Sequence, residues 1–352
     1  MRWVSPLRYR WSAPSRFFFF FLTVATLIAP VPYVFFKPGV PDDISGSLIS
    51  IKKATTYPIN GKLYITSILV TNPDAPVFGA ETLFNWAVGP NVVLPRTVVY
   101  PDRVNDQNES SQSQEEMANS QVSATSAALR YLGYPVIDHY VIKGFRAYSA
   151  AKGKLQVGDQ VIAIDGKAIG NINEIRESYA TKKVGDDLAI TVRRKDSGGI
   201  FSAKTVNVTL VANQDSPQQS SAPKPFIGIL VGIDAELPID VKFNLDNVGG
   251  PSAGLMFAIG IVDKLTSEDL VRGRSIAGTG TISADGEVDA IGGIEEKIIG
   301  ASRKGATIFL APRANCPDIR HYAKGLQVIP VSTLAEAISV LRAPDDSKFP
   351  RC

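Results

Sequence analysis

The stretch that decides the fold reads Asn247-Val-Gly-Gly-Pro-Ser-Ala-Gly-Leu-Met-Phe-Ala-Ile-Gly-Ile-Val-Asp-Lys-Leu265. Glycines and a proline surround Ser252, and the apolar helical run behind them places this serine at a helix start. Unpaired backbone N–H groups and the positive end of the helix dipole collect there. A hydroxyl at this point can attack a carbonyl carbon while the N–H groups hold the oxyanion. A serine that merely caps the helix is the alternative, and on this stretch alone it is the better interpretation.

A second helix start carries a lysine that changes this balance. Residues 292–301 read GGIEEKIIGA, and their isoleucines and last alanine form an apolar stripe at helical spacing. Lys297 lies at the edge of the stripe, whereas Glu295 and Glu296 are expected to point away from it. Apolar surroundings lower the pKa of a lysine, and its neutral amine can then serve as general base for a serine. The alternative is a surface lysine with a solvated ammonium group.

Together, the Gly250–Gly254 segment and Lys297 resemble the Ser–Lys dyad of Lon-type serine proteases. The resemblance runs from about Pro225 to Ala337. It includes the GTGTIS run at 278–283 and the GEVDAIGGIEEK run at 286–297. It implies that Ser252 is the nucleophile, Lys297 the general base and Thr279 a threonine that assists the base. It also implies an oxyanion or substrate loop at Gly250, Pro251 and Ala253.

The chain departs from the ATP-dependent members of that family in two respects. They carry an aspartate three residues before the serine, where this chain has Gly249. The chain also contains no G-x-x-x-x-G-K-[ST] motif, so we expect neither ATP binding nor an unfolding activity. Substrates should then be loose segments or chains that are already unfolded, and no cofactor is expected.

Composition excludes several other classes of protein. The 352 residues hold 37 Lys+Arg and 34 Asp+Glu, and a net charge of +3 does not favour nucleic-acid binding. Two histidines, His139 and His321, almost exclude a histidine metal cluster, so no metal site is expected. A histidine-based hydrolase would need one of them beside Ser252. The two cysteines, Cys316 and Cys352, can form one disulfide in an oxidising compartment, and the sequence leaves this open.

The middle of the chain resembles a PDZ domain. Residues 153–167 read GKLQVGDQVIAIDGK, with turns at Gly158-Asp159 and Asp165-Gly166 that flank a strand-like run. An unrelated small β domain is the alternative. In PDZ domains, backbone N–H groups receive a peptide C-terminus, and the peptide adds a strand to a sheet edge. The resemblance places this peptide-binding loop at Leu132, Gly133, Tyr134, Pro135 and Val136.

The N-terminus predicts a membrane anchor. Residues 17–36 form an uncharged apolar run that follows a basic segment, residues 1–16, with four arginines. The positive-inside rule keeps the N-terminus cytoplasmic and exports the remainder. Pro30 and Pro32 should kink or end the helix early, after about 13 to 15 residues. A cleaved signal peptide is the alternative, but no convincing A-x-A site follows the run.

These features predict an α+β or α/β protein with a Lon-type proteolytic domain, a PDZ domain and an N-terminal transmembrane helix. The expected boundaries are a β-rich and helical segment at 42–130 that joins the protease domain, a PDZ domain at 131–212, a linker at 213–225, the proteolytic domain at 226–343 and a tail at 344–352.

The chain as a whole resembles the ATP-independent, membrane-anchored PDZ-containing Lon-like proteases of bacteria, which implies polypeptide substrates, an extracytoplasmic catalytic domain and a hexameric ring. The alternative is a catalytically silent PDZ scaffold at the membrane.

Overall fold

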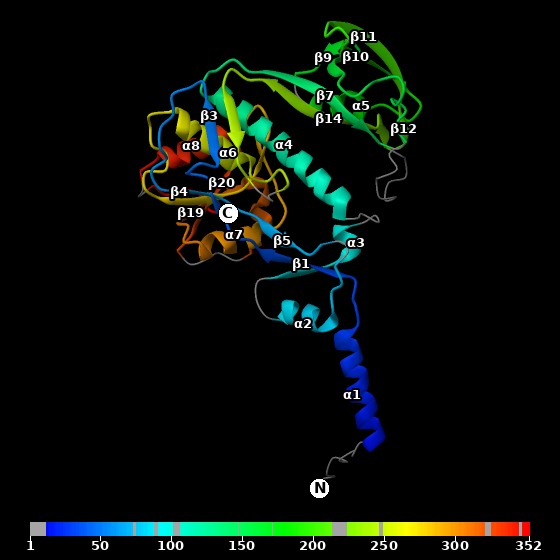
Figure 1. Cartoon of the computed structure of the whole chain (residues 1–352), viewed down its shortest axis with the longest axis vertical. Helices are drawn as coiled ribbons and strands as arrows, with labels where there is room; N and C mark the ends of the chain where they lie inside the picture. Colours follow the sequence, from blue (N-terminus) through cyan, green and yellow to red (C-terminus); the bar gives the residue numbers. More distant parts are fainter. Residues whose placement is uncertain are drawn as a thin grey trace, which may run out of the picture.

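The computed structural model describes residues 12–352 except 73–74, 88–90, 101–105, 147, 171, 213–223, 246–248, 321–324 and 345–346. Two folded units lie above an N-terminal helix that projects from them (Figure 1). The lower unit contains the larger core, and the upper unit is a β-rich module (Figure 1). Helix α4 (Asp106–Tyr131) leads from the lower unit into the upper one.

A five-stranded sheet is the centre of the lower unit. Its order is β2-β4-β16-β19-β20, and all neighbours are parallel except β2 and β4. The strands are β2 (Asp42–Asp43), β4 (Lys62–Ile65), β16 (Ser275–Gly278), β19 (Ile308–Pro312) and β20 (Gln327–Val331). Strands that lie far apart in the sequence therefore share one sheet, and the segment 42–130 contributes two of them.

Helix α6 (Gly254–Leu265) forms the middle of the protease-type core. It is apolar on every side and ten of its twelve residues are buried, as expected of a helix that packs on all faces. It contacts α4, α8 (Leu334–Arg342) and the sheet. Alanines of α4, Ala124, Ala127 and Ala128, pack in the same cluster as Leu255 and Phe257 of α6. Their small side chains let the two helices approach closely.

Smaller elements complete this unit. They are β3 (Ile49–Lys52) paired with β15 (Asp240–Phe243), β17 (Thr281–Ile282) paired with β18 (Val288–Asp289), helix α7 (Ile294–Arg303) and the 3₁₀ helix η1 (Arg313–Asp318). A disulfide joins Cys316 of η1 to Cys352, with 4.8 Å between their Cα atoms. The pairing that the sequence left open is therefore present, and it ties the tail to the core.

The upper unit is a six-stranded antiparallel sheet with its own core. Its main order is β11-β10-β8-β7-β14, with β9 paired to β8. The elements are β7 (Ile137–Phe145), β8 (Gln160–Ile164), β9 (Lys167–Ala168), α5 (Ile172–Ala180), β10 (Asp187–Lys195), β11 (Phe201–Thr209) and β14 (Ile229–Glu236), with the small pair β12 (Val211–Ala212) and β13 (Pro225–Phe226) beside it.

Strand β14 corrects the predicted boundary between the two domains. It pairs with β7 from Ile229↔Phe145 to Glu236↔Ile137, although it follows the predicted linker. The start of the segment assigned to the proteolytic domain, residues 226–236, thus belongs to the PDZ-like sheet. This placement depends on pairing between segments that are distant in the sequence, because the run Ile229–Ile233 pairs with the edge of β7. Most of the predicted linker, 213–223, lies outside the described residues.

The N-terminal helix α1 (Ala13–Ile28) differs from the predicted span at 17–36. It ends before Pro30, and the chain then enters β1 (Tyr33–Pro38), where Val34 and Phe35 are buried. Proline lacks the N–H that a continuing helix needs, which explains the early end. In the part of the chain that the structure describes, no helix is long and apolar enough to cross a membrane.

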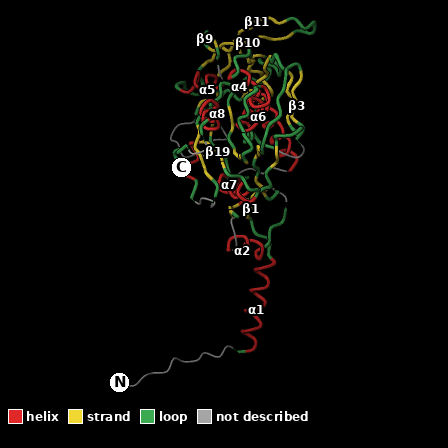
Figure 2. Tube along the Cα trace, turned by 90° about the vertical axis from the view of Figure 1, so that its left-hand side faces the viewer, coloured by secondary structure: helices red, strands yellow, loops and turns green. Residues whose placement is uncertain are grey.

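A three-stranded sheet connects α1 to the protease-type core. Its order is β5-β1-β6, with β5 (Ile68–Val70) at one edge and β6 (Val92–Pro95) at the other. Two short helices, α2 (Gly79–Ala87) and α3 (Arg96–Val99), lie beside it, and the side view shows α2 between α1 and the body (Figure 2). Strand β1 also packs against α7.

Candidate active site

Ser252 stands at the start of α6, where the backbone is held by three hydrogen bonds. Its carbonyl oxygen accepts from the Gly280 amide at 2.8 Å and from the Thr279 hydroxyl at 2.9 Å. The Leu255 amide in turn donates to the Gly280 carbonyl at 3.0 Å. The loop after β16 therefore fixes the first turn of α6, and with it the position of the serine hydroxyl.

Lys297 meets that hydroxyl. Its Nζ lies 2.6 Å from Ser252 Oγ and donates to it, and it lies 3.1 Å from Thr279 Oγ1. Only 2% of Lys297 is exposed, and burial lowers the pKa of its amine from 10.5 to about 8. A substantial fraction of the amine is then neutral near physiological pH. The structure thus brings together the three side chains predicted as nucleophile, base and assistant.

Of the predicted oxyanion loop, Ala253 is the member with an amide to offer. The Gly250 amide donates to the Ser113 carbonyl of α4 at 2.9 Å, and Pro251 has no N–H. Within the described residues, the amides of Ser252 and Ala253 donate no backbone hydrogen bond. They lie at the positive end of α6, which suits a developing negative charge. Gly250 and Pro251 therefore shape the loop, and Ala253 is the candidate donor.

Close packing against Ser113 of α4 explains the glycine at position 249. A Cβ there would lie 2.1 Å from Ser113 Oγ and 3.1 Å from Ser113 Cβ, so a side chain fits only if Ser113 moves. Gly250 has a φ of +81°, a conformation that glycine adopts without a steric penalty. The chain thus approaches α4 closely just before the serine, in the place where an aspartate was expected from the resemblance.

The prediction that Glu296 points away from the core is wrong. Only 3% of Glu296 is exposed, burial raises the pKa of its carboxyl, and its Oε1 has no hydrogen-bond partner within the described residues. Helix α7 is covered on two faces, because β1 packs against it in addition to the sheet. Glu295 is half-buried and accepts a hydrogen bond from the Arg320 amide at 2.8 Å.

A cavity of about 540 Å³ opens onto the serine and the lysine. One wall is the loop at 249–253, and the opposite wall is β5 with the residues before it, Ile65 to Leu69. Strand β5 pairs only with β1 in the described sheet, so its other edge is open. The sequence analysis placed these residues in the β-rich and helical segment 42–130 but did not connect them to the site.

His139 does not join this site in the structure. His139 lies on β7, where its Nε2 is 2.9 Å from Glu236 Oε1 of β14. His321 lies outside the described residues. The histidine-based alternative therefore has no support in the described geometry around Ser252.

The predicted PDZ peptide-binding loop, Leu132 to Val136, ends α4 instead. The Leu132, Gly133 and Tyr134 amides donate to the carbonyls of Ala128, Arg130 and Leu129. Gly133 has a φ of +81°, the left-handed conformation usual after a helix. Pro135 has no N–H, so four of the five residues offer no free amide to a carboxylate; the Val136 amide donates no backbone hydrogen bond within the described residues, and the role of the loop stays a prediction.

Two family models match the chain, one for each folded unit. Residues 246–342 match the Lon protease (S16) C-terminal proteolytic domain, and residues 131–210 match the PDZ domain. The chain therefore combines a Lon-type proteolytic domain with a PDZ domain, and the resemblance to PDZ-containing Lon-like proteases is confirmed at the level of these two domains.

Curated relatives match the proteolytic part. The chain is 37% identical over 106 residues to the Lon protease of Endomicrobium trichonymphae, which covers 28% of this chain and 13% of that protein. It is 39% identical over 94 residues to the Lon protease of Neorickettsia sennetsu, which covers 26% of this chain and 11% of that protein. The chain thus spans only a small part of the length of these relatives.

Among solved structures, the PDZ domain of the SdrC-like protein of Listeria innocua is 24% identical and covers 26% of this chain and 92% of that chain. Its TM-score of 0.21 is too low to support an argument about this chain.

Proposed function

We propose that the chain is an ATP-independent serine endopeptidase in which Ser252 is the nucleophile and neutral Lys297 is the general base. The observation that carries this proposal is the 2.6 Å contact between Lys297 Nζ and Ser252 Oγ in surroundings that lower the pKa of the lysine to about 8. A buried, unpaired amine has little structural value, but it suits proton transfer near neutral pH.

The proposed reaction has two halves. Lys297 takes the proton of Ser252, and the alkoxide attacks the peptide carbonyl to form a tetrahedral intermediate. The amides of Ser252 and Ala253 donate to the oxyanion. Lys297 then gives its proton to the leaving amine, and an acyl-enzyme remains. Lys297 next takes a proton from a water molecule as its oxygen attacks the ester carbon; the bond to Ser252 Oγ then breaks, Lys297 returns the proton to Oγ, and the acid product leaves. Thr279 orients the amine throughout.

The substrate is proposed to bind as an extended segment. Residues of β5 line the cavity that contains Ser252, and β5 has one edge without a strand partner in the described sheet, with which an extended peptide can pair. This mode uses backbone groups and so accepts many sequences. It requires an unfolded segment, which fits a chain without an ATP-binding motif.

The PDZ domain is proposed to hold a second part of the same polypeptide. Strand β14 is at the end of its sheet, and its outer edge has no strand partner within the described residues. It follows a turn at Phe226–Ile229 in which Gly228 has a φ of +81° and Ile227 is buried. A substrate tail that adds to β14 would be kept near the catalytic domain.

We also propose that α1 attaches the protein to a membrane, with the catalytic domain outside the cytoplasm. The side chains of Phe17 to Phe21 are exposed, and a row of exposed phenylalanines is costly in water. The disulfide between Cys316 and Cys352 suits an oxidising compartment. Cofractionation with membranes, compared between the full chain and a chain that begins at residue 30, tests the attachment.

Hydrolysis of casein or of an unfolded peptide tests the proposed activity. We expect cleavage by the wild type and by His321→Ala, and loss of cleavage in Ser252→Ala and Lys297→Ala. Undiminished cleavage in Lys297→Ala would contradict the dyad. Failure of the wild type to cleave any unfolded substrate would favour a scaffold without catalytic activity.

A further inference from the structure

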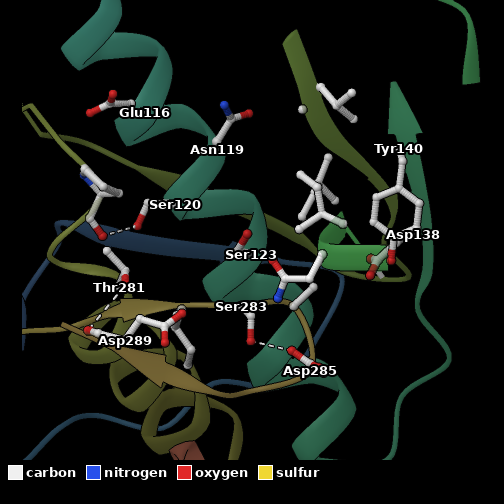
Figure 3. Close-up of a pocket in the computed structure, with 18 of the residues that line it drawn as sticks. Glu116, Asn119, Ser120, Ser123, Asp138, Tyr140, Thr281, Ser283, Asp285 and Asp289 are labelled. Atoms are coloured by element: carbon white, nitrogen blue, oxygen red, sulfur yellow. Dashed lines mark hydrogen bonds between the residues drawn. The ribbon is translucent and has the colours of Figure 1, made fainter. Parts of the chain in front are cut away.

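A second cavity, of about 510 Å³, lies between the proteolytic and PDZ domains. Its walls come from α4, from β7 and β14, from the start of α5, and from the segment 281–289. Figure 3 shows Ser120 and Ser123 of α4 on one side, Asp138 and Tyr140 on the other, and the segment that carries Asp285 below them. We call this cavity the interdomain pocket.

The interdomain pocket is separated from the active site by one loop. Pro251 lines the pocket, and its carbonyl accepts a hydrogen bond from Ser120 at 2.9 Å. The next residue, Ser252, lines the catalytic cavity. Substrate residues a few positions from the cleaved bond lie within roughly 10 to 20 Å of it, since an extended chain advances about 3.3 Å per residue. Such residues can therefore reach the pocket.

The charged side chains that line the interdomain pocket are mostly acidic. The described lining residues include four carboxylates and one cation, Arg130. The carboxylates are Glu116, Asp138, Asp285 and Asp289. Arg130 is already committed: it donates to the Ala284 carbonyl at 2.6 Å and forms an ion pair with Asp138 Oδ2 at 2.9 Å. Arg130 balances Asp138, so Asp285 and Asp289 give this side of the pocket an excess of negative charge.

Asp138 provides an observation independent of this charge count. Only 7% of its side chain is exposed, and its Oδ1 has no hydrogen-bond partner within the described residues. A buried carboxylate oxygen without a partner is costly unless a donor reaches it. Rotation about the terminal torsion of an aspartate is easy, so a small turn of the carboxylate would direct Oδ1 to a donor in the pocket.

The geometry does not favour a metal ion as the partner of the Asp138 carboxylate. In the described part of the chain, no three His, Cys, Asp or Glu side chains are close enough to hold one. The remaining walls suit a long side chain with a charged end. Ile172, Val231 and Ile233 give apolar surface, and the same lining contains Asp138, Asp285 and Asp289. This combination matches the aliphatic stem and cationic head of lysine or arginine.

We propose that the interdomain pocket is a specificity subsite that takes a lysine or arginine side chain of the polypeptide substrate, with Asp138, Asp285 and Asp289 as its recognition residues. This subsite rests on the proposed protease function. It gives the enzyme a preference at a position removed from the cleaved bond, and it lies against β14, where a polypeptide held by the PDZ domain would pass.

A scan with matched peptides tests this subsite. Each quenched fluorescent peptide carries one arginine or one citrulline, its neutral analogue of nearly equal shape, at successive positions on both sides of the cleaved bond. With the full chain at low salt, we expect one position where arginine raises kcat/KM about tenfold over citrulline, the size of one charge-assisted hydrogen bond. The preference should fall as salt rises, because screening weakens it.

Variants then assign the preference to the pocket. Asp285 and Asp289 are exposed, so the double change Asp285→Asn with Asp289→Asn should leave the fold intact and reduce the arginine preference to about two- to threefold or less. Asp138→Asn should also reduce it. Glu287→Gln is the matched control, since Glu287 is exposed on the same segment but does not line the pocket, and it should keep the preference.

Three results would overturn the subsite: equal cleavage of arginine and citrulline peptides at every position, an undiminished preference in the double variant, or an equal loss in Glu287→Gln. If the wild type cleaves none of the peptides, the proposed protease function fails, and the subsite is judged by binding. Fluorescence anisotropy of the same peptides with the full chain should then still favour arginine in wild type, and equal binding would reject the subsite.

Discussion

Lys297 in the proteolytic domain and Asp159 in the PDZ domain are both charged side chains that folding removes from water, with 2% and 1% of each exposed. Asp159 is fully compensated: Arg194 donates to its two oxygens at 2.7 and 2.6 Å, and the Gln156 amide donates at 2.8 Å. Among the described residues, Lys297 has only two hydrogen-bond partners, the hydroxyl groups of Ser252 and Thr279.

The difference separates a structural charge from a reactive one. Because Asp159 and Arg194 satisfy each other, their ion pair holds a turn of the PDZ domain in place. Because no carboxylate compensates Lys297, its pKa falls and its amine can exchange a proton. Three substitutions and the pH dependence of hydrolysis test this difference.

The largest expected effect is on catalysis. Lys297→Met should lower kcat/KM by about a thousandfold, the usual contribution of a general base, while the melting temperature stays equal or rises. The methionine fills a similar volume without a buried charge. Peptide hydrolysis and thermal unfolding of the same preparation measure both quantities. A clear fall in melting temperature would mean that Lys297 also stabilises the fold.

Asp159→Ala should have the opposite profile. It leaves Arg194 and the Gln156 amide without their shared partner and should lower the free energy of unfolding by about 3 kcal/mol. Asp234→Ala is the matched control in the same sheet, because the Asp234 side chain is 55% exposed and its ion pair with Lys143 should contribute less than about 1 kcal/mol. Denaturant titration of both variants measures the difference. Equal losses would contradict the assignment of Asp159 as a structural charge.

A smaller effect is expected at Thr279, which is fully buried and touches both partners of the dyad. Thr279→Val removes the hydroxyl that accepts from Lys297, so the amine is positioned less well and kcat should fall about tenfold. The charged lysine also loses an acceptor, so the apparent pKa of the rate profile should move down. Thr279→Ser should restore both. An upward move would contradict this role.

The meeting of Ser252 and Lys297 could be predicted from sequence because its signals are local. The glycines and proline around Ser252, the helical run behind them, and the lysine in the first turn of α7 each lie within a few residues, and family resemblance linked the two segments. The helix end before Pro30 was likewise predictable from proline chemistry, although the strand that follows it was not.

The parts that could not be predicted depend on contacts between distant segments. Glu296 is buried because β1, more than two hundred residues earlier, covers a second face of α7. Strand β14 joins the PDZ sheet across a linker, and the composition of 226–236 does not reveal which sheet it will enter. The interdomain pocket exists only where both domains meet, so no sequence window contains it.

The pH dependence of wild-type hydrolysis tests the central claim, that neutral Lys297 activates Ser252, most directly. The pKa of Lys297 is lowered to about 8 by burial, and only the form without the extra proton can act as base. From pH 6 to 9, kcat/KM on a peptide without ionisable side chains should rise and level off with an apparent pKa near 8. A profile that is flat across this range, or that rises only above pH 10 as for an exposed lysine, would contradict the account.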